Sequence, residues 1–146
     1  MVIGDGPHRE QLRALEAETR AVNWIQYSTD PLELARYYRA ADLFVHPGTQ
    51  ETFGLVALES QACGTPVVGI RGSRLDGIIL HDQEGWAAEN SAEALAGAIE
   101  QFSRRDLRLL GDLAAKGATE YGWPRVFERL FCIYREVCSN YPQTRR

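Results

Sequence analysis

Short apolar runs alternate along the chain with longer stretches in which apolar residues recur every three or four positions. The short runs are rich in β-branched and aromatic residues, and they occupy residues 2–3, 24–25, 43–45 and 66–70. Continuously apolar runs separated by helical stretches of about 10 to 15 residues are typical of parallel strands that are buried on both faces. The pattern therefore predicts an α/β fold with a doubly wound, mostly parallel, Rossmann-like sheet.

Local signals place the helices between these strands. Asp30 is a favourable N-cap, Pro31 suits the first helical position, and Glu33 stands at the reciprocal position of a capping box. A helix over about 53–62 should end at Gly64, because a proline follows two residues later. Further helices are expected around Leu12 and Leu15, after an N-cap at Asn90 or Ser91, over about 107–120, and over about 123–137.

The last predicted helix carries a broad apolar stripe. Its members are Trp123, Val126, Phe127, Leu130, Ile133, Tyr134 and Val137. Most of this stripe is expected to cover the domain's own sheet. Any part that stays uncovered would form an exposed apolar patch, and self-association through that patch is the expected consequence.

Composition narrows the class of protein. The 146 residues suit one domain, and 20 acidic against 16 basic residues give a net charge of −4, which argues against a general nucleic-acid binder. No apolar run approaches the roughly 20 residues of a membrane span. The three cysteines are far apart and lack metal-site spacing. The simplest interpretation is a cytoplasmic protein, with peripheral membrane association left open if the chain is part of a longer protein.

Two glutamates, Glu51 and Glu59, stand eight positions apart around the start of the third predicted helix. In a doubly wound sheet, ligands bind at the carboxyl ends of the strands, where loops lead into helix N-termini. The amides of Phe53, Gly54 and Leu55 would face out of this N-terminus. Such an end carries about half a positive charge and unpaired N–H groups, so it suits a phosphate.

The spacing of the two carboxylates suggests what they could hold. A carboxylate only accepts hydrogen bonds, and its two oxygens match the two hydroxyl donors of a vicinal diol. At the helical rise, the pair is separated by no more than about 12 Å along the axis, comparable to the span from ribose to hexose in a nucleotide sugar. One glutamate can therefore hold ribose and the other the transferred sugar. The same spacing also occurs on ordinary solvated helix faces.

The motifs in their order carry a family resemblance. They are Gly4-Asp5-Gly6-Pro7, the Ala-Ala-Asp-Leu-Phe-Val-His-Pro run at 40–47, Glu51-Thr52-Phe53-Gly54-Leu55, Glu59, and the Gly-Thr-Pro-Val-Val run at 64–68. Together they resemble the donor-binding C-terminal domain of retaining GT-B glycosyltransferases, and more narrowly the group 1 family (glycosyltransferase family 4) with its E-x7-E motif. The resemblance covers about residues 1–135, so residues 1–146 are expected to form a nucleotide-sugar binding domain.

The resemblance implies a role for each matching residue. Glu51 is the expected catalytic glutamate, which orients the sugar and supports its oxocarbenium-like charge rather than attacking as a nucleophile. Glu59 is expected to bind ribose. The other expected donor-binding positions are the amides of Phe53, Gly54 and Leu55 and the glycine loop at Gly4 and Gly6. By itself, that loop could equally be a tight strand-to-helix turn.

The implied reaction is transfer of a sugar from a nucleotide diphosphate donor to a sugar, lipid or small-molecule acceptor, with retention at the anomeric carbon. No cofactor or metal is implied, and His8, His46 and His81 lack metal-ligand spacing. His46 is interpreted as a strand-end residue rather than a catalyst. The turn at 26–28 occupies the usual base-contacting region, although Gln26 stands where the family often has glycine.

The family pattern departs at the N-terminal end. Members carry a further strand and helix before the Gly-Asp-Gly loop, with an Arg and a Lys that neutralise the diphosphate, and an acceptor-binding domain before those. In the strand order 3-2-1-4-5-6, the strand without a counterpart is the central one. Either the chain is a piece of a longer enzyme, which we favour, or its first and third strands pair directly.

Two functions stay open at this point. The chain can be the donor half of a retaining glycosyltransferase, inactive without its N-terminal acceptor domain. Alternatively, it is a non-catalytic nucleotide-sugar binding or interaction module that a partner chain completes.

Overall fold

The structure, a computed structural model, describes residues 1–79 and 86–141. His81 therefore lies outside the described residues. In chain order the elements are β1 (Val2–Ile3), α1 (Arg9–Thr19), β2 (Trp24–Ile25), α2 (Pro31–Ala40), β3 (Phe44–Val45), α3 (Leu55–Ala62), β4 (Val67–Ile70), the 3-10 helix η1 (Arg74–Gly77), β5 (Trp86–Ala87), α4 (Ala92–Ser103), α5 (Leu107–Ala118), the 3-10 helix η2 (Thr119–Tyr121) and α6 (Trp123–Asn140).

A parallel three-stranded sheet in the order β3-β4-β5 forms the core. All of β4 is buried, and its side chains alternate between the two faces. Val68 and Ile70 pack with Phe102 of α4 and Leu110 of α5, whereas Val67 packs on the other face with Ala57 of α3. The central strand is thus covered by helices on both sides, which confirms the predicted α/β class.

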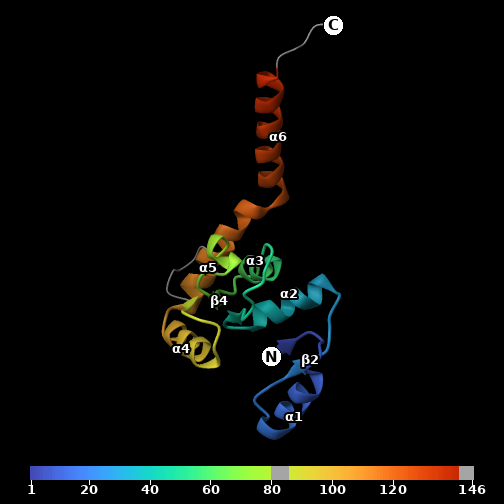
Figure 1. The fold of residues 1–146 in the computed structure, drawn as a ribbon, viewed down its shortest axis with the longest axis vertical. Coiled ribbons are helices and arrows are strands. Elements are labelled where there is room, and N and C mark those ends of the chain that lie inside the picture. Colours follow the sequence, from blue (N-terminus) through green and yellow to red (C-terminus); the bar gives the residue numbers. More distant parts are fainter. Residues whose placement is uncertain (80–85, 142–146) are drawn as a thin grey trace.

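The first two strands form a separate parallel pair. Val2 is paired with Trp24 and Ile3 with Ile25, and α1 connects the two strands. In Figure 1 this blue unit lies below α2 and to one side of α4. Within the described residues no strand joins the two sheets. The direct pairing between β1 and β3, one of the two sequence-based alternatives, is therefore not formed.

Most helix ends lie close to the predicted positions. Asp30 caps α2 by accepting the N–H of Leu32, and Ser91 caps α4 by accepting the N–H of Ala94. The expected capping box is only half formed, because Glu33 accepts hydrogen bonds from the hydroxyls of Ser28 and Tyr37 instead. The strand β5 and both 3-10 helices were not predicted, since the sequence around Trp86 and Ala87 has no β-branched run and 3-10 turns leave no periodic pattern.

The prediction that α6 covers the domain's own sheet is wrong. No residue of α6 is buried, and in Figure 1 the helix extends away from the rest of the molecule. The physical reason is that α4 and α5 already cover the face of the sheet to which Val68 and Ile70 point. The apolar stripe is exposed instead, and the rings of Trp123, Phe127 and Phe131 stack on one another with centroids 5.5 and 6.2 Å apart.

Among the described residues, no helix combines the length and the apolar character needed to cross a membrane.

Candidate functional site

The predicted catalytic glutamate lies in the loop between β3 and α3. This loop leaves the carboxyl end of β3 and delivers the chain to Gly54, the N-cap of α3. Oε1 of Glu51 turns back over the helix N-terminus, where it accepts the N–H groups of Thr52 at 2.9 Å and Phe53 at 3.3 Å. The amides of Gly54, Phe53 and Thr52 hold the pKa of the Glu51 carboxyl below its usual value, and His46 lowers it further.

His46 lies directly after β3, as expected for a strand-end residue, and it also contacts Glu51. Its Nε2 is 3.5 Å from Oε2 of Glu51, and its Nδ1 accepts the N–H of Gly48 at 3.2 Å. Only 14% of the His46 side chain is exposed, against 25% of Glu51. The sequence analysis missed this contact. A usable signal was present, because a histidine at the carboxyl end of a strand precedes the glutamate by five positions in one short loop.

Glu59 lies on the second turn of α3 and is exposed. Its Oε2 accepts a hydrogen bond of 3.4 Å from the hydroxyl of Tyr38, which comes from α2. Burial first and Glu59 second raise the pKa of Tyr38 to about 12. Tyr38 was not among the predicted site residues, since nothing in the local sequence shows that α2 crosses beside α3.

The residues at the start of α3 differ in exposure. Gly54 is buried, with a φ of 85°, whereas Phe53 and Leu55 are 48% and 62% exposed. A Cβ added to Gly54 would lie 2.5 Å from Cδ2 of Leu75 and 3.2 Å from Cδ1 of Ile78. Glycine is therefore required here by the core as well as by the backbone conformation. Of the three amides that the sequence analysis proposed as ligand donors, that of Phe53 donates to Glu51 and that of Gly54 also stabilises its carboxylate.

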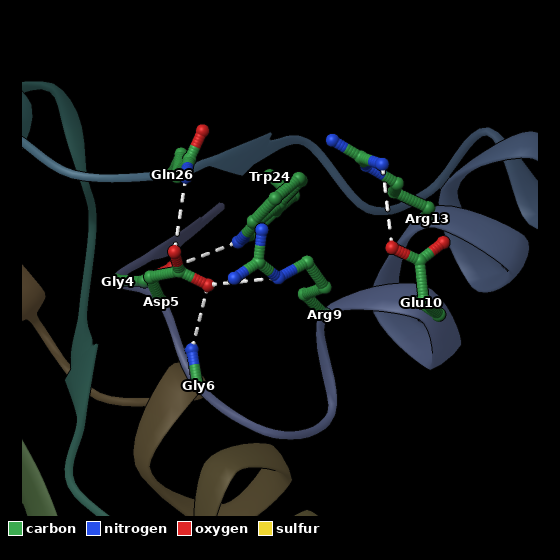
Figure 2. A network of polar contacts seen from close by, with 8 residues as sticks. All are labelled: Gly4, Asp5, Gly6, Arg9, Glu10, Arg13, Trp24 and Gln26. Carbon is green, nitrogen blue, oxygen red and sulfur yellow. Dashed lines mark hydrogen bonds and ion pairs between the residues drawn. The ribbon is translucent and has the colours of Figure 1, made fainter.

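The glycine loop between β1 and α1 is organised around Asp5 (Figure 2). Its Oδ1 accepts the N–H of Gly6 at 2.8 Å and lies 3.4 Å from Nε of Arg9, while its Oδ2 accepts the side-chain amide of Gln26 at 2.9 Å. The hydrogen bond from Gln26, followed by that from Gly6 and by the positive charge of Arg9, holds the pKa of Asp5 below its usual value. Asp5 therefore ties the loop to the turn after β2, a link that the sequence did not reveal.

A hydrogen bond from Trp24 also holds this loop in place. The indole Nε1 of Trp24 donates to the carbonyl oxygen of Gly4 at 2.9 Å, and the guanidinium of Arg13 stacks 5.3 Å from the indole ring. Space for a side chain exists at Gly6, where a Cβ would meet no atom within 4 Å.

The structure brings the residues from Glu51 to Leu55 together at one helix end. Gly4 and Gly6 lie in the loop after β1, which belongs to the other sheet, and within the described residues they make no hydrogen bond to that helix end.

No group of three or more His, Cys, Asp or Glu side chains within residues 1–79 and 86–141 is arranged to hold a metal ion.

Comparison with known proteins identifies the class of this fold and site. Residues 1–117 match the family model described as glycosyl transferases group 1. The chain belongs to this family. In fold it is similar to sucrose-phosphate synthase from Thermosynechococcus elongatus, with a TM-score of 0.75 and 28% identity over 94% of this chain and 38% of that chain. The GT-B assignment of the sequence analysis is thereby confirmed.

Two relatives show the range of the family. The chain is 40% identical to a D-inositol 3-phosphate glycosyltransferase of Thermobispora bispora, over 77% of this chain and 27% of that protein. It is 37% identical to a GDP-mannose-dependent alpha-(1-6)-phosphatidylinositol dimannoside mannosyltransferase of Mycobacterium tuberculosis, over 86% of this chain and 32% of that protein. The chain thus spans about a third or less of the length of these relatives.

Proposed function

We propose that this chain binds a nucleotide diphosphate sugar and forms the donor side of a glycosyltransferase that retains the anomeric configuration. Glu51 is assigned to the transferred sugar and Glu59 to the ribose. The amides at the start of α3 and the loop at Gly4 and Gly6 are assigned to the diphosphate. This proposal rests on the sequence motifs and on family membership.

The arrangement of Glu51 is the observation that carries the proposal. Its carboxylate is held in place by the N–H groups of Thr52 and Phe53 at the positive end of α3. A negative group that is fixed before the ligand arrives loses little conformational entropy on binding. Because the carboxylate stays ionised at neutral pH, it is suited to accept sugar hydroxyls and to support positive charge at the anomeric carbon.

The names of the relatives guide the choice of ligands. One is named for GDP-mannose, and both are named for acceptors that contain an inositol group. We therefore propose an acceptor with an inositol or inositol-phosphate group, and we include GDP and GDP-mannose among the donors to be tested. UDP with UDP-glucose and ADP with ADP-glucose complete the set, because the base-contacting turn has Gln26 in place of the common glycine.

Isothermal calorimetry on the purified chain tests the assignment of the two glutamates. Glu59→Ala should weaken binding of both the free diphosphate and the nucleotide sugar by about ten- to a hundredfold, the range for hydrogen bonds to a charged group. Glu51→Ala should weaken binding of the nucleotide sugar alone. Glu100→Ala, on the exposed side of α4, serves as the matched control and should change neither.

Equal losses for both ligands at both positions would show that the two glutamates do not bind separate parts of the donor. Absence of binding by the wild-type chain to all three diphosphates and all three nucleotide sugars would contradict the proposed function itself.

A further inference from the structure

We propose that His46 is a positioning residue that fixes the second oxygen of the Glu51 carboxylate toward the transferred sugar. This inference rests on the proposed function, because it assigns His46 a role only through the sugar-binding role of Glu51. His46 itself contacts no part of the donor in this proposal. Four observations support it: the hydrogen bond that the ring accepts at Nδ1, its fixed position, the division of the Glu51 oxygens, and the local need for glycine.

The hydrogen bond from Gly48 determines the tautomer of the His46 ring. The backbone N–H of Gly48 donates to Nδ1, so this nitrogen is an acceptor and carries no proton. In the neutral imidazole the proton must then be on Nε2. Nε2 is the nitrogen that lies 3.5 Å from Oε2 of Glu51. The ring therefore presents its single N–H to the carboxylate. The contact is long, as is common in unliganded sites whose hydrogen bonds shorten when substrate binds.

The ring has little freedom to turn away from Glu51. The backbone of His46 is anchored to the central strand, since its N–H donates to the carbonyl of Val68 at 2.9 Å. On the side chain, the ring of Phe44 contacts the imidazole edge-on, with centroids 6.2 Å apart. The backbone of Gly48 approaches so closely that an added Cβ would stand 2.6 Å from Cε1 of His46. Strand, aromatic ring and glycine together hold the imidazole in one orientation.

The two oxygens of Glu51 have different partners. Oε1 accepts the N–H groups of Thr52 and Phe53, whereas the contact of Oε2 in the described structure is with His46. Both oxygens turn together about the Cγ–Cδ bond, so removing His46 takes away one restraint on that rotation and leaves the hydrogen bonds from the amides of Thr52 and Phe53. A carboxylate that holds two hydroxyls of a sugar needs both oxygens oriented. The loss should appear in sugar binding and leave diphosphate binding unchanged.

Two substitutions separate the two ring nitrogens. In His46→Gln the side-chain amide nitrogen reaches the position of Nε2 and can still donate to Glu51. In His46→Asn the side-chain oxygen takes the position of Nδ1 and can still accept from Gly48, but nothing reaches the carboxylate. Both substitutions introduce a neutral amide, and each variant keeps one of the two contacts of the His46 ring. The thermal unfolding curves of the two variants should therefore be similar.

Calorimetry with the tightest-binding diphosphate among UDP, GDP and ADP, and with its matching nucleotide sugar, is the test. His46→Asn should weaken nucleotide-sugar binding about three- to tenfold, the range for one ordinary hydrogen bond, with diphosphate binding unchanged. His46→Gln should restore most of the affinity. In a Glu51→Ala background, His46→Asn should cause no further loss, since the effect passes through Glu51.

Several results would overturn the inference. Equal losses in both variants, or a loss that extends to the free diphosphate, would show a merely structural role for His46, and so would an additive loss in the Glu51→Ala background. Wild-type affinity in His46→Asn would show no role. If the wild-type chain binds none of the six ligands, the proposed function fails and this inference fails with it.

The ring chemistry can be checked without any ligand. Nitrogen-15 NMR of the histidine side chains should show His46 with an unprotonated Nδ1 and a protonated Nε2, its signal assigned by its loss in His46→Gln. The opposite tautomer would also overturn the inference, even if the chain binds nucleotide sugars as proposed.

Discussion

Replacing Gly54 by alanine should damage the fold and the site at one point. Gly54 is buried at the N-cap of α3, its φ is 85°, and an added Cβ would stand 2.5 Å from Leu75 and 3.2 Å from Ile78. Two separate penalties follow. The left-handed backbone costs a residue with a side chain about 1–2 kcal/mol, and overpacking a dense core costs about 1–3 kcal/mol. Gly54→Ala should therefore destabilise the chain by about 2–5 kcal/mol.

Gly64 provides the matched control for the backbone penalty. It ends the α3 region with a φ of 81°, nearly the same as that of Gly54, but an added Cβ would meet no atom within 4 Å. Gly64→Ala should thus cost only the backbone part, about 1–2 kcal/mol. The difference in unfolding free energy between the two variants measures the clash of the added Cβ with Leu75 and Ile78. The contacting atoms are the ends of these two flexible side chains, so they can move aside in part.

Urea unfolding followed by circular dichroism measures both variants, and an unchanged m-value would show that the unfolded states remain comparable. The reasoning is refuted if Gly54→Ala and Gly64→Ala lose the same free energy of unfolding. In that case the core beneath Gly54 would have room for a methyl group, and glycine would be needed there only for its backbone conformation.

Three further outcomes are expected. The unfolded tyrosine has a pKa near 10, and folding raises the pKa of Tyr38 to about 12. Its contribution to stability should therefore be complete below about pH 10 and lost as the pH rises through about 12, so the urea midpoint of wild type should fall relative to that of Tyr38→Phe across this window. Gly111→Ala should lower the free energy of unfolding in urea titrations by at least about 2 kcal/mol, because its Cβ would stand 2.2 Å from the backbone carbonyl oxygen of Gly64. Gly97→Ala is the control: its Cβ would lie in open space on α4, and the variant should gain up to about 1 kcal/mol. Phe127→Asp, at the centre of the stacked rings of α6, should reduce self-association of the chain in light scattering, and an unchanged aggregate size would show that this helix does not mediate it.

The strand β4 could be predicted from the sequence because it is buried on both faces, whereas β1, β2 and β3 are only partly buried. The run at 66–70 is continuously apolar, and the structure buries every residue of β4 within it. By contrast, β5 consists of Trp86 and Ala87, and neither belongs to a β-branched run that would mark a strand. How the strands group into sheets depends on contacts far apart in the chain, so the sequence left open whether β1 would pair with β3.

The position of α6 shows a different limit. Its apolar stripe correctly predicted an amphipathic helix, because the spacing of apolar residues determines which face avoids water. The pattern carries no information about the surface that covers this face. The domain's sheet was the nearest candidate, but its faces are already occupied by other helices, and the stripe of α6 is exposed.

The candidate site also contains residues that the sequence identified and residues that it did not. Glu51 and Glu59 could be selected because they belong to a local motif, and motif residues are close in the chain. Tyr38 stands 21 positions before Glu59 and its contact depends on how α2 packs beside α3. The contact of His46 with Glu51 spans only five positions, yet it depends on the side-chain rotamer and on the close approach of Gly48, neither of which a sequence pattern specifies.

Gly54 shows how the site depends on the core. The sequence analysis assigned only the amide of this glycine to a ligand, whereas the structure shows that the side chains of Leu75 and Ile78 leave no room for a Cβ. The start of α3 is therefore fixed by the packing of the 3-10 helix η1 and the residue after it against that helix end. Because Glu51 binds the amides of the same turn, any change that lifts this turn from the core also moves the carboxylate. Variants that loosen the packing around Leu75 should thus weaken sugar binding before they unfold the chain, although none of their atoms lies in the proposed site.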